Sequence, residues 1–137
     1  MDIEKEIEKK YTELQITTQQ MKQLQKQIAL LNNQLVELTL LQQSINEIRD
    51  VKIGTSILVT IGNGIYAKAE LKENNEFLVN VGSNTVVKKD IDSTTKLIQQ
   101  QLEEISGVYE QMMLELRVLY EHANSKEEEI NKLAKQI

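Results

Sequence analysis

The sequence contains no cysteine, proline or tryptophan, and it has only one histidine and one phenylalanine. Without cysteine, neither a disulfide framework nor a thiolate metal site can form. The lone histidine, His122, cannot build a histidine-based metal or catalytic cluster. Because proline is absent, no helix is interrupted by one. An aromatic content of 4% is poor material for a compact globular core but is normal for coiled coils.

Other absences narrow the class of protein further. The net charge of −5 argues against the phosphate backbone of nucleic acid as the main partner. No apolar run reaches about 18 residues and the N-terminus lacks a signal-type apolar stretch, so we expect neither a membrane span nor secretion. No Walker loop, GxGxxG or GxSxG motif occurs. We therefore expect a soluble, cytoplasmic, non-enzymatic protein without a metal or cofactor.

Residues 1–49 have the pattern of one long helix, because Gln, Glu, Lys and Leu dominate and nothing breaks the run. The positions expected to pack against a partner helix, which we call the seam, recur at steps of three and four residues, as in a coiled coil. The seam positions are Ile3, Ile7, Lys10, Leu14, Thr17, Met21, Leu24, Ile28, Leu31, Leu35, Leu38, Gln42 and Ile45. All but Lys10, Thr17 and Gln42 are apolar.

Residues 91–137 have the same pattern and predict a second long helix, with Asp92 or Ser93 as its N-cap. Its seam positions are Ile91, Thr95, Ile98, Leu102, Ile105, Tyr109, Met112, Leu116, Leu119, Ala123, Lys126, Ile130, Leu133 and Ile137. When Ile3 is placed opposite Ile137, every seam position of the first helix meets one of the second. This register predicts an antiparallel pair within one chain; the alternative is a parallel coiled coil between chains.

Residues 51–89 read as β-structure, and they hold four of the five glycines. Strands are expected over residues 53–61, 65–71, 76–81 and 85–89, in two hairpins. Asn63-Gly64 suggests a two-residue turn in the first hairpin. A three-residue loop over 62–64 instead places Ile61 opposite Ile65 and keeps one face apolar, so we predict the longer loop with Gly64 in a bulge. In the second hairpin, residues 82–84 form the loop.

These patterns predict one domain over residues 1–137. It is an α+β fold, mostly α, in which a long antiparallel coiled-coil hairpin carries two β-hairpins between its helices. Isolated hairpins are marginal in water and expose strand edges, so we expect them to pair with other subunits. The alternative is a small four-stranded sheet within a monomer. The predicted oligomerisation residues are Ile57, Val59, Ile61, Ile65, Phe77, Val79, Val81, Val86 and Val87.

The seam is weakest toward the free ends of the helices. There Lys10, Thr17 and Lys126 occupy seam positions and reduce the buried apolar area. Beyond them lie apolar residues such as Ile3 and Leu133. Two interpretations stay open: the ends splay and expose these residues, or the residues close the last layers of the seam.

The whole chain resembles the prefoldin family, in its archaeal alpha class. The resemblance is carried by residues 53–59 (IGTSILV), 65–67 (IYA) and 77–89 (FLVNVGSNTVVKK), with the glycine-centred second hairpin as the most specific part. Many members of that family have prolines in the first hairpin, and this chain has none.

The resemblance implies a hexamer of two alpha and four beta subunits, built on a β-barrel platform formed by the hairpins. It implies an ATP-independent holdase that captures unfolded clients and passes them to a group II chaperonin. The client-binding residues at the helix ends would be Ile3, Ile7, Tyr11, Ile130, Leu133 and Ile137. Partners would be beta-type subunits or copies of the chain itself, with neither nucleic acid nor membrane. A self-assembling scaffold or filament is the alternative, and a coiled-coil adaptor has no motif in its favour.

Overall fold

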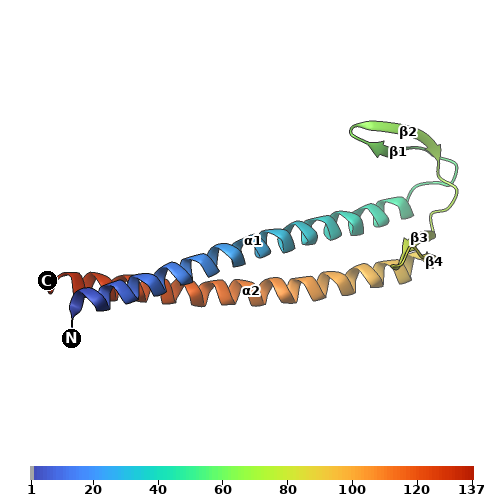
Figure 1. The fold of residues 1–137 in the computed structure, drawn as a ribbon. Coiled ribbons are helices and arrows are strands. Elements are labelled where there is room, and N and C mark those ends of the chain that lie inside the picture. Colours follow the sequence, from blue (N-terminus) through green and yellow to red (C-terminus); the bar gives the residue numbers. More distant parts are fainter. Residues whose placement is uncertain (1) are drawn as a thin grey trace. The chain divides into compact units, whose positions relative to one another are not determined.

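A computed structural model describes residues 2–137 (Figure 1). The elements are α1 (Ile3–Arg49), β1 (Ser56–Gly62), β2 (Ile65–Glu70), β3 (Glu76–Asn80), β4 (Val86–Asp90) and α2 (Ile91–Ala134). The chain divides into two compact units. The terminal unit comprises residues 1–35 and 104–137, and the hairpin unit comprises residues 36–103. This element order confirms the predicted fold class of two long helices with two β-hairpins between them.

Burial in both helices follows the predicted seam. Every seam position of α1 is buried or half-buried, and so is every seam position of α2 up to Leu133. The most buried apolar side chains are Leu24 in the terminal unit and Ile45 and Ile98 in the hairpin unit, with 8%, 6% and 4% of their surface exposed. Ile137 differs: α2 ends at Ala134, and Ile137 is 73% exposed beyond it.

Within each unit, the segments of α1 and α2 run antiparallel (Figure 1). Lys10 Nζ lies 2.6 Å from Glu129 Oε2, and Lys126 Nζ lies 2.7 Å from Glu13 Oε2. The predicted register places Lys10 opposite Ile130, the residue after Glu129. A shift by one heptad would move these partners by two turns, about 10 Å. The register is therefore confirmed.

The same register holds in the hairpin unit. Gln42 Nε2 donates a hydrogen bond to Gln99 Oε1 at 3.2 Å, and these residues lie on α1 and α2 respectively. Arg49 Nη2 lies 4.0 Å from Asp92 Oδ1 at the point where α1 ends and α2 begins. The antiparallel pair within one chain is thus observed rather than a parallel pair between chains.

The strand register of the first hairpin is the predicted one, but its turn is not. Ile57 pairs with Ala69 and Val59 with Ala67, as expected. However, Gly62 rather than Ile61 lies opposite Ile65, and the register shifts between Thr60 and Gly62. The prediction of a three-residue loop was therefore wrong, because the extra residue forms a bulge in β1 instead.

The turn itself consists of Asn63 and Gly64. Their φ angles are +48° and +79°, the left-handed values that a type I′ turn requires at both central positions. Asn tolerates this conformation better than most residues with a side chain, and glycine adopts it without steric cost. The Asn-Gly pair thus specifies the turn that its composition suggests.

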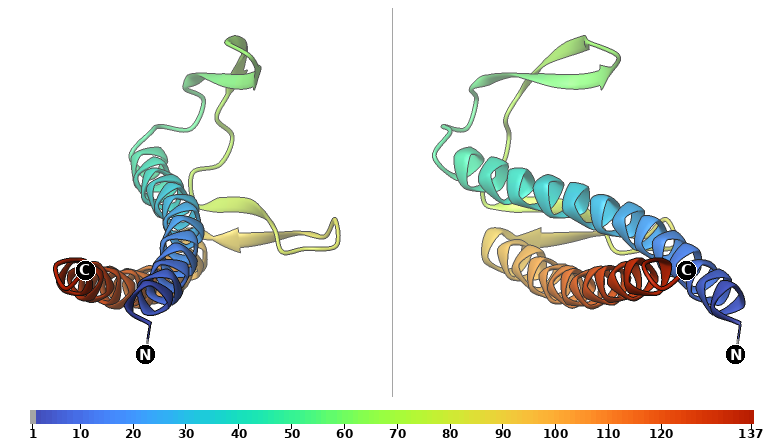
Figure 2. Two further views of the ribbon diagram at one scale, coloured as in Figure 1. Left: turned by 60° about the vertical axis from the view of Figure 1, so that its left-hand side comes forward. Right: turned by 90° about the vertical axis from the view of Figure 1, so that its left-hand side faces the viewer.

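The second hairpin has the predicted three-residue loop. Val81 N donates to Thr85 O at 3.0 Å, which continues the β3–β4 pairing up to residues 82–84. Gly82, Ser83 and Asn84 all have positive φ. In the described residues the strands form two separate two-stranded sheets, β1–β2 and β3–β4, and not one four-stranded sheet (Figure 2).

Helix α2 begins directly after β4, and its N-cap is Asp90 rather than the predicted Asp92 or Ser93. Asp90 Oδ1 accepts a hydrogen bond from Ser93 N at 2.7 Å, which satisfies one of the free N–H groups of the first turn. This hydrogen bond from Ser93 lowers the pKa of the Asp90 carboxyl. The prediction missed Asp90 because the residue also ends a strand.

Candidate interaction surfaces

The second hairpin has one covered face and one open face. Phe77 and Val79 are half-buried and line a groove together with Ile45 and Ile98 of the helices. Between them Leu78 points the other way and is 71% exposed. Two of the predicted oligomerisation residues, Phe77 and Val79, thus already pack within their own chain, whereas Leu78 offers an apolar side chain that the prediction did not include.

The predicted residues of β4 do not share one face. Val87 pairs with Val79 and Val86 pairs with Asn80, so neighbouring valines point to opposite sides of the ribbon. Both valines are exposed, and so is Val81 at the start of the loop.

The first hairpin exposes apolar side chains on both faces. Ile57 is half-buried, whereas Val59 and Ile65 are exposed, and Ile61 is exposed at the bulge. The opposite face carries two further exposed residues, Leu58 and Tyr66. The sequence-based prediction omitted both residues because it considered only one face of the hairpin. Their size and their place between the residues of that face could have indicated a second apolar face.

The free ends of the helices are closed around their apolar residues. Ile3, Ile7, Ile130 and Leu133 are half-buried. Tyr11 and Ile137, the other two predicted client-binding residues, are exposed. The interpretation in which the end residues close the last seam layers therefore describes this structure.

Next to these layers lies a cluster of four charged residues, which we call the charge cluster: Lys10, Glu13, Lys126 and Glu129. Each lysine comes from the seam of one helix and reaches a glutamate on the other, at 2.6 and 2.7 Å. Lys126 also lies 3.8 Å from Glu129 on its own helix. The lysines that weaken the apolar seam are thus compensated by carboxylates across it.

The ion pairs shift the pKa values of three of these groups. The hydrogen bond from Lys126 lowers the pKa of Glu13, and the hydrogen bond from Lys10 lowers the pKa of Glu129. The same contact with Glu129 raises the pKa of Lys10. Both carboxylates and the ammonium of Lys10 therefore favour their charged forms.

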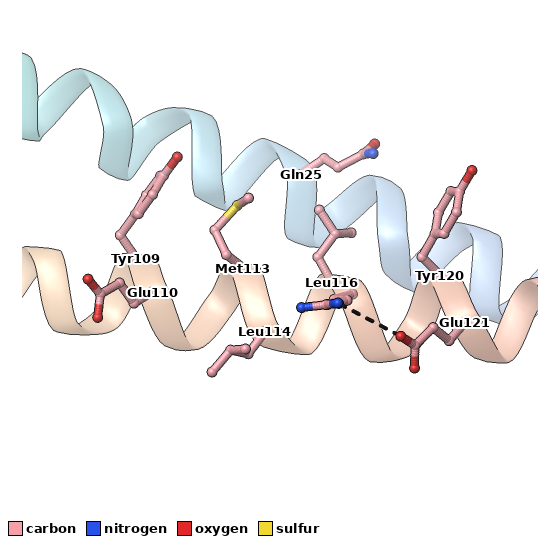
Figure 3. A pocket seen from close by; sticks show the side chains of 9 residues that line it. Gln25, Tyr109, Glu110, Met113, Leu114, Leu116, Tyr120 and Glu121 are labelled. Carbon is pink, nitrogen blue, oxygen red and sulfur yellow. Dashed lines mark ion pairs between the residues drawn. The ribbon is translucent and has the colours of Figure 1, made fainter.

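A groove in the terminal unit, which we call the flank groove, runs along α2 where it faces α1 (Figure 3). Its floor consists of Tyr109, Met113, Leu116 and Tyr120, and Gln25 of α1 borders it. Figure 3 shows the two tyrosines and Met113 extending from α2 toward α1, while Glu110 and Glu121 lie beside them across the near side of α2. Met113 and Tyr120 are exposed and Tyr109 is half-buried. The groove was not predicted from the sequence.

Over residues 2–137, no group of three His, Asp or Glu side chains is arranged to hold a metal ion. Within the same residues, neither helix contains a stretch apolar and long enough to cross a bilayer.

An antiparallel coiled-coil hairpin whose helices are joined by two β-hairpins is a distinctive class of structure. The same fold occurs in a filamentous PFD from Methanocaldococcus jannaschii, solved by cryo-EM. The two align with a TM-score of 0.74 at 15% sequence identity, over 84% of this chain and 95% of that one. At this identity the likeness establishes the fold.

Sequence comparison establishes the family. The profile of the prefoldin subunit family matches residues 17–136. The prefoldin subunit alpha of Thermofilum pendens is 30% identical over 104 residues, covering 76% of this chain and 81% of that protein. The prefoldin subunit alpha of Archaeoglobus fulgidus is 26% identical over 95% of both chains. The chain belongs to the prefoldin family, in its archaeal alpha class.

Proposed function

We propose that this chain is a subunit of an ATP-independent holdase that captures unfolded proteins at the free ends of its helices and delivers them to a group II chaperonin. The observation that carries the proposal is the position of Ile3, Ile7 and Leu133 beyond the charge cluster, with Ile130 opposite Lys10 at its edge. These four apolar side chains are only half-buried, so a modest separation of the helix ends would present them to a client. Tyr11 and Ile137 add apolar surface that is already exposed.

The hairpins support the assembly part of the proposal. Leu58, Ile65 and Leu78 are large apolar side chains that stay exposed in the single chain, and each two-stranded ribbon has open edges that can accept a further strand. We propose that they join with beta-type prefoldin subunits in a hexamer of two alpha and four beta chains. The mass of the chain alone and after mixing with an archaeal beta-type subunit, measured by sedimentation, tests this stoichiometry.

Aggregation of a chemically denatured client, followed by light scattering without ATP, tests the holdase activity. The assembled protein should suppress aggregation. Replacing Ile3, Ile7, Leu133 and Ile137 with serine should strongly reduce the suppression while the assembly keeps its mass. A matched control carries serine at Leu30 and Val118, which are each 64% exposed and lie away from the helix ends. Equal suppression by the two variants would rule out the helix ends as the client site.

A self-assembling filament or scaffold is the second candidate. It is favoured by the exposed apolar residues on both faces of the first hairpin, Val59 and Ile65 on one and Leu58 and Tyr66 on the other. A ribbon with two such faces can contact two neighbours. The fold neighbour from Methanocaldococcus jannaschii is itself a filamentous PFD. This candidate predicts long homo-oligomers in electron micrographs of the chain alone and no suppression of client aggregation.

A further inference from the structure

The positions that flank the seam beside the flank groove carry no charged side chain. Positions beside a coiled-coil seam usually carry Glu or Lys. On the flank that contains the groove, α1 has Thr18, Gln25 and Asn32 at successive heptads, and α2 has Met113 and Tyr120. None of these side chains is charged. Over the same heptads the other flank carries Gln20, Gln27 and Gln34 on α1 and Glu115 on α2, so it differs from the groove flank by one acidic side chain.

The floor of the groove is suited to apolar groups of varied shape. Met113 is flexible and polarizable and adapts to irregular partners. Tyr109 and Tyr120 present an apolar ring with a polar tip, as aromatic residues at recognition surfaces often do. They lie eleven residues apart on α2, which corresponds to about 16 Å along the helix axis. An extended segment of about five residues has this length.

The border of the groove selects the charge of its occupant. Three ionisable side chains lie on the border: Glu110, Arg117 and Glu121. Arg117 Nε lies 3.7 Å from Glu121 Oε1, so its charge is offset within the border itself. The border therefore has an excess of negative charge, and the whole chain has a net charge of −5. An acidic segment would be repelled, whereas a lysine or arginine could approach Glu110 and stack on a tyrosine ring.

We propose that the flank groove is a second client-binding site, which takes extended unfolded segments that combine apolar with basic residues. The inference rests on the proposed holdase function and adds a site and a substrate preference to it. Client segments longer than the helix ends can hold would continue along the same flank, past Tyr11 and Glu127, to the groove. The basic preference follows from the border and not from the apolar floor.

Two peptides with identical apolar residues but with lysines in one and glutamates in the other provide the direct test. Each peptide is labelled and titrated with the assembled protein, and fluorescence anisotropy is measured at low salt. We expect the lysine peptide to bind about tenfold more tightly than the glutamate peptide, because the acidic border attracts the lysines and repels the glutamates. Equal affinities would overturn the proposal.

A photo-crosslinking residue locates the bound peptide. Placed at Met113, it should react with the lysine peptide, whereas at Glu115, exposed on the opposite flank of the same helix, it should not. Equal crosslinking at both positions would overturn the assignment. Crosslinking of Met113 to a second copy of the chain would also overturn it, because the flank would then be an interface between copies.

A charge substitution separates this site from the helix ends. Met113→Glu with Tyr120→Glu should weaken binding of the lysine peptide at least several-fold if the occupant needs the apolar floor. Val118→Glu introduces a charge at an exposed residue that does not line the groove and serves as the control. If the Met113/Tyr120 variant loses its helical circular dichroism, its weaker binding cannot be assigned to the groove. The crosslinking test at Met113 and Glu115 then decides whether the groove binds the peptide. Suppression of client aggregation without any binding of the lysine peptide would refute this site and leave the proposed function standing.

Discussion

The ammonium group of Lys10 lies 2.6 Å from a carboxylate oxygen of Glu129 on the other helix. Lys10 is a seam residue, so its side chain replaces apolar packing with an ion pair at the border between the apolar ends and the rest of the terminal unit. Lys126 and Glu13 repeat the arrangement with the helices exchanged. The two pairs hold the helix ends together by charge, in a part of the seam where little apolar area is buried.

Breaking one of these pairs should loosen the helix ends selectively. For Glu129→Gln, we expect faster amide hydrogen exchange in residues 3–9 and 130–134, because those turns depend on the charge cluster for closure. Residues around Leu24, where the seam is apolar, should keep their protection against amide hydrogen exchange. Glu128→Gln removes a neighbouring charge that has no ion pair across the seam in this structure and is the matched control. Unchanged exchange at the ends would show that the cluster does not hold them.

Acid should have the same effect as that substitution. The pKa values of Glu13 and Glu129 are lowered in the folded chain, so their stabilisation is present above the unfolded carboxyl pKa of about 4.3. It is lost as the pH falls through the lower folded values. The pKa of Lys10 is raised, so its contribution is present below the unfolded lysine value and is lost only as the pH rises through the folded one. Distances between spin labels at the helix ends should therefore be constant between about pH 5 and pH 10 and increase in acid.

Truncation of the buried seam should destabilise each unit by a similar amount. Leu24→Ala in the terminal unit and Ile98→Ala in the hairpin unit remove side chains that are 8% and 4% exposed. Each should lower the free energy of unfolding by about 2–4 kcal/mol, from lost transfer energy and the remaining cavity. Leu30→Ala, at a side chain that is 64% exposed, should change it by about 0.5 kcal/mol or less. Urea denaturation followed by circular dichroism measures all three.

The turn of the first hairpin should resist substitution at Gly64. Its φ of +79° is rarely adopted by residues with a side chain, although a Cβ there would meet no neighbouring atom. Gly64→Ala should therefore cost roughly 1–2 kcal/mol of hairpin stability through backbone strain alone. Gly107→Ala, in a helical glycine with equally open surroundings, should instead stabilise by up to about 1 kcal/mol. Thermal denaturation of the two variants distinguishes strain from simple loss of a glycine.

Hydrophobic periodicity was sufficient to predict the helices, their seams and their register. Each seam repeats over many heptads, so one misplaced residue such as Lys10 or Thr17 does not obscure it. The pairing of Ile57 with Ala69 was also predictable, because any other register would have mixed apolar and polar residues on one face.

Local features of the hairpin unit were not predictable in the same way. A longer loop and a bulge in β1 both pair Val59 with Ala67 and Ile57 with Ala69. The apolar pattern therefore could not place the bulge at Ile61. Asp90 was missed as a cap because a strand residue is seldom considered one. The flank groove was not predicted because it forms only when the two helices are paired. Met113 and Tyr120 belong to no sequence motif that indicates a groove.

The direct passage from β4 into α2 at Asp90 has a mechanical consequence. Residue 90 ends the strand and residue 91 begins the helix, so no linker absorbs rotation between them, and the Asp90–Ser93 hydrogen bond fixes the joint. The end of α1 is different, because six residues separate Arg49 from Ser56. Any twist imposed on the second hairpin by a neighbouring chain would pass into α2 first. Inserting one residue after Asp90 would turn the seam of α2 by about 100° relative to that hairpin.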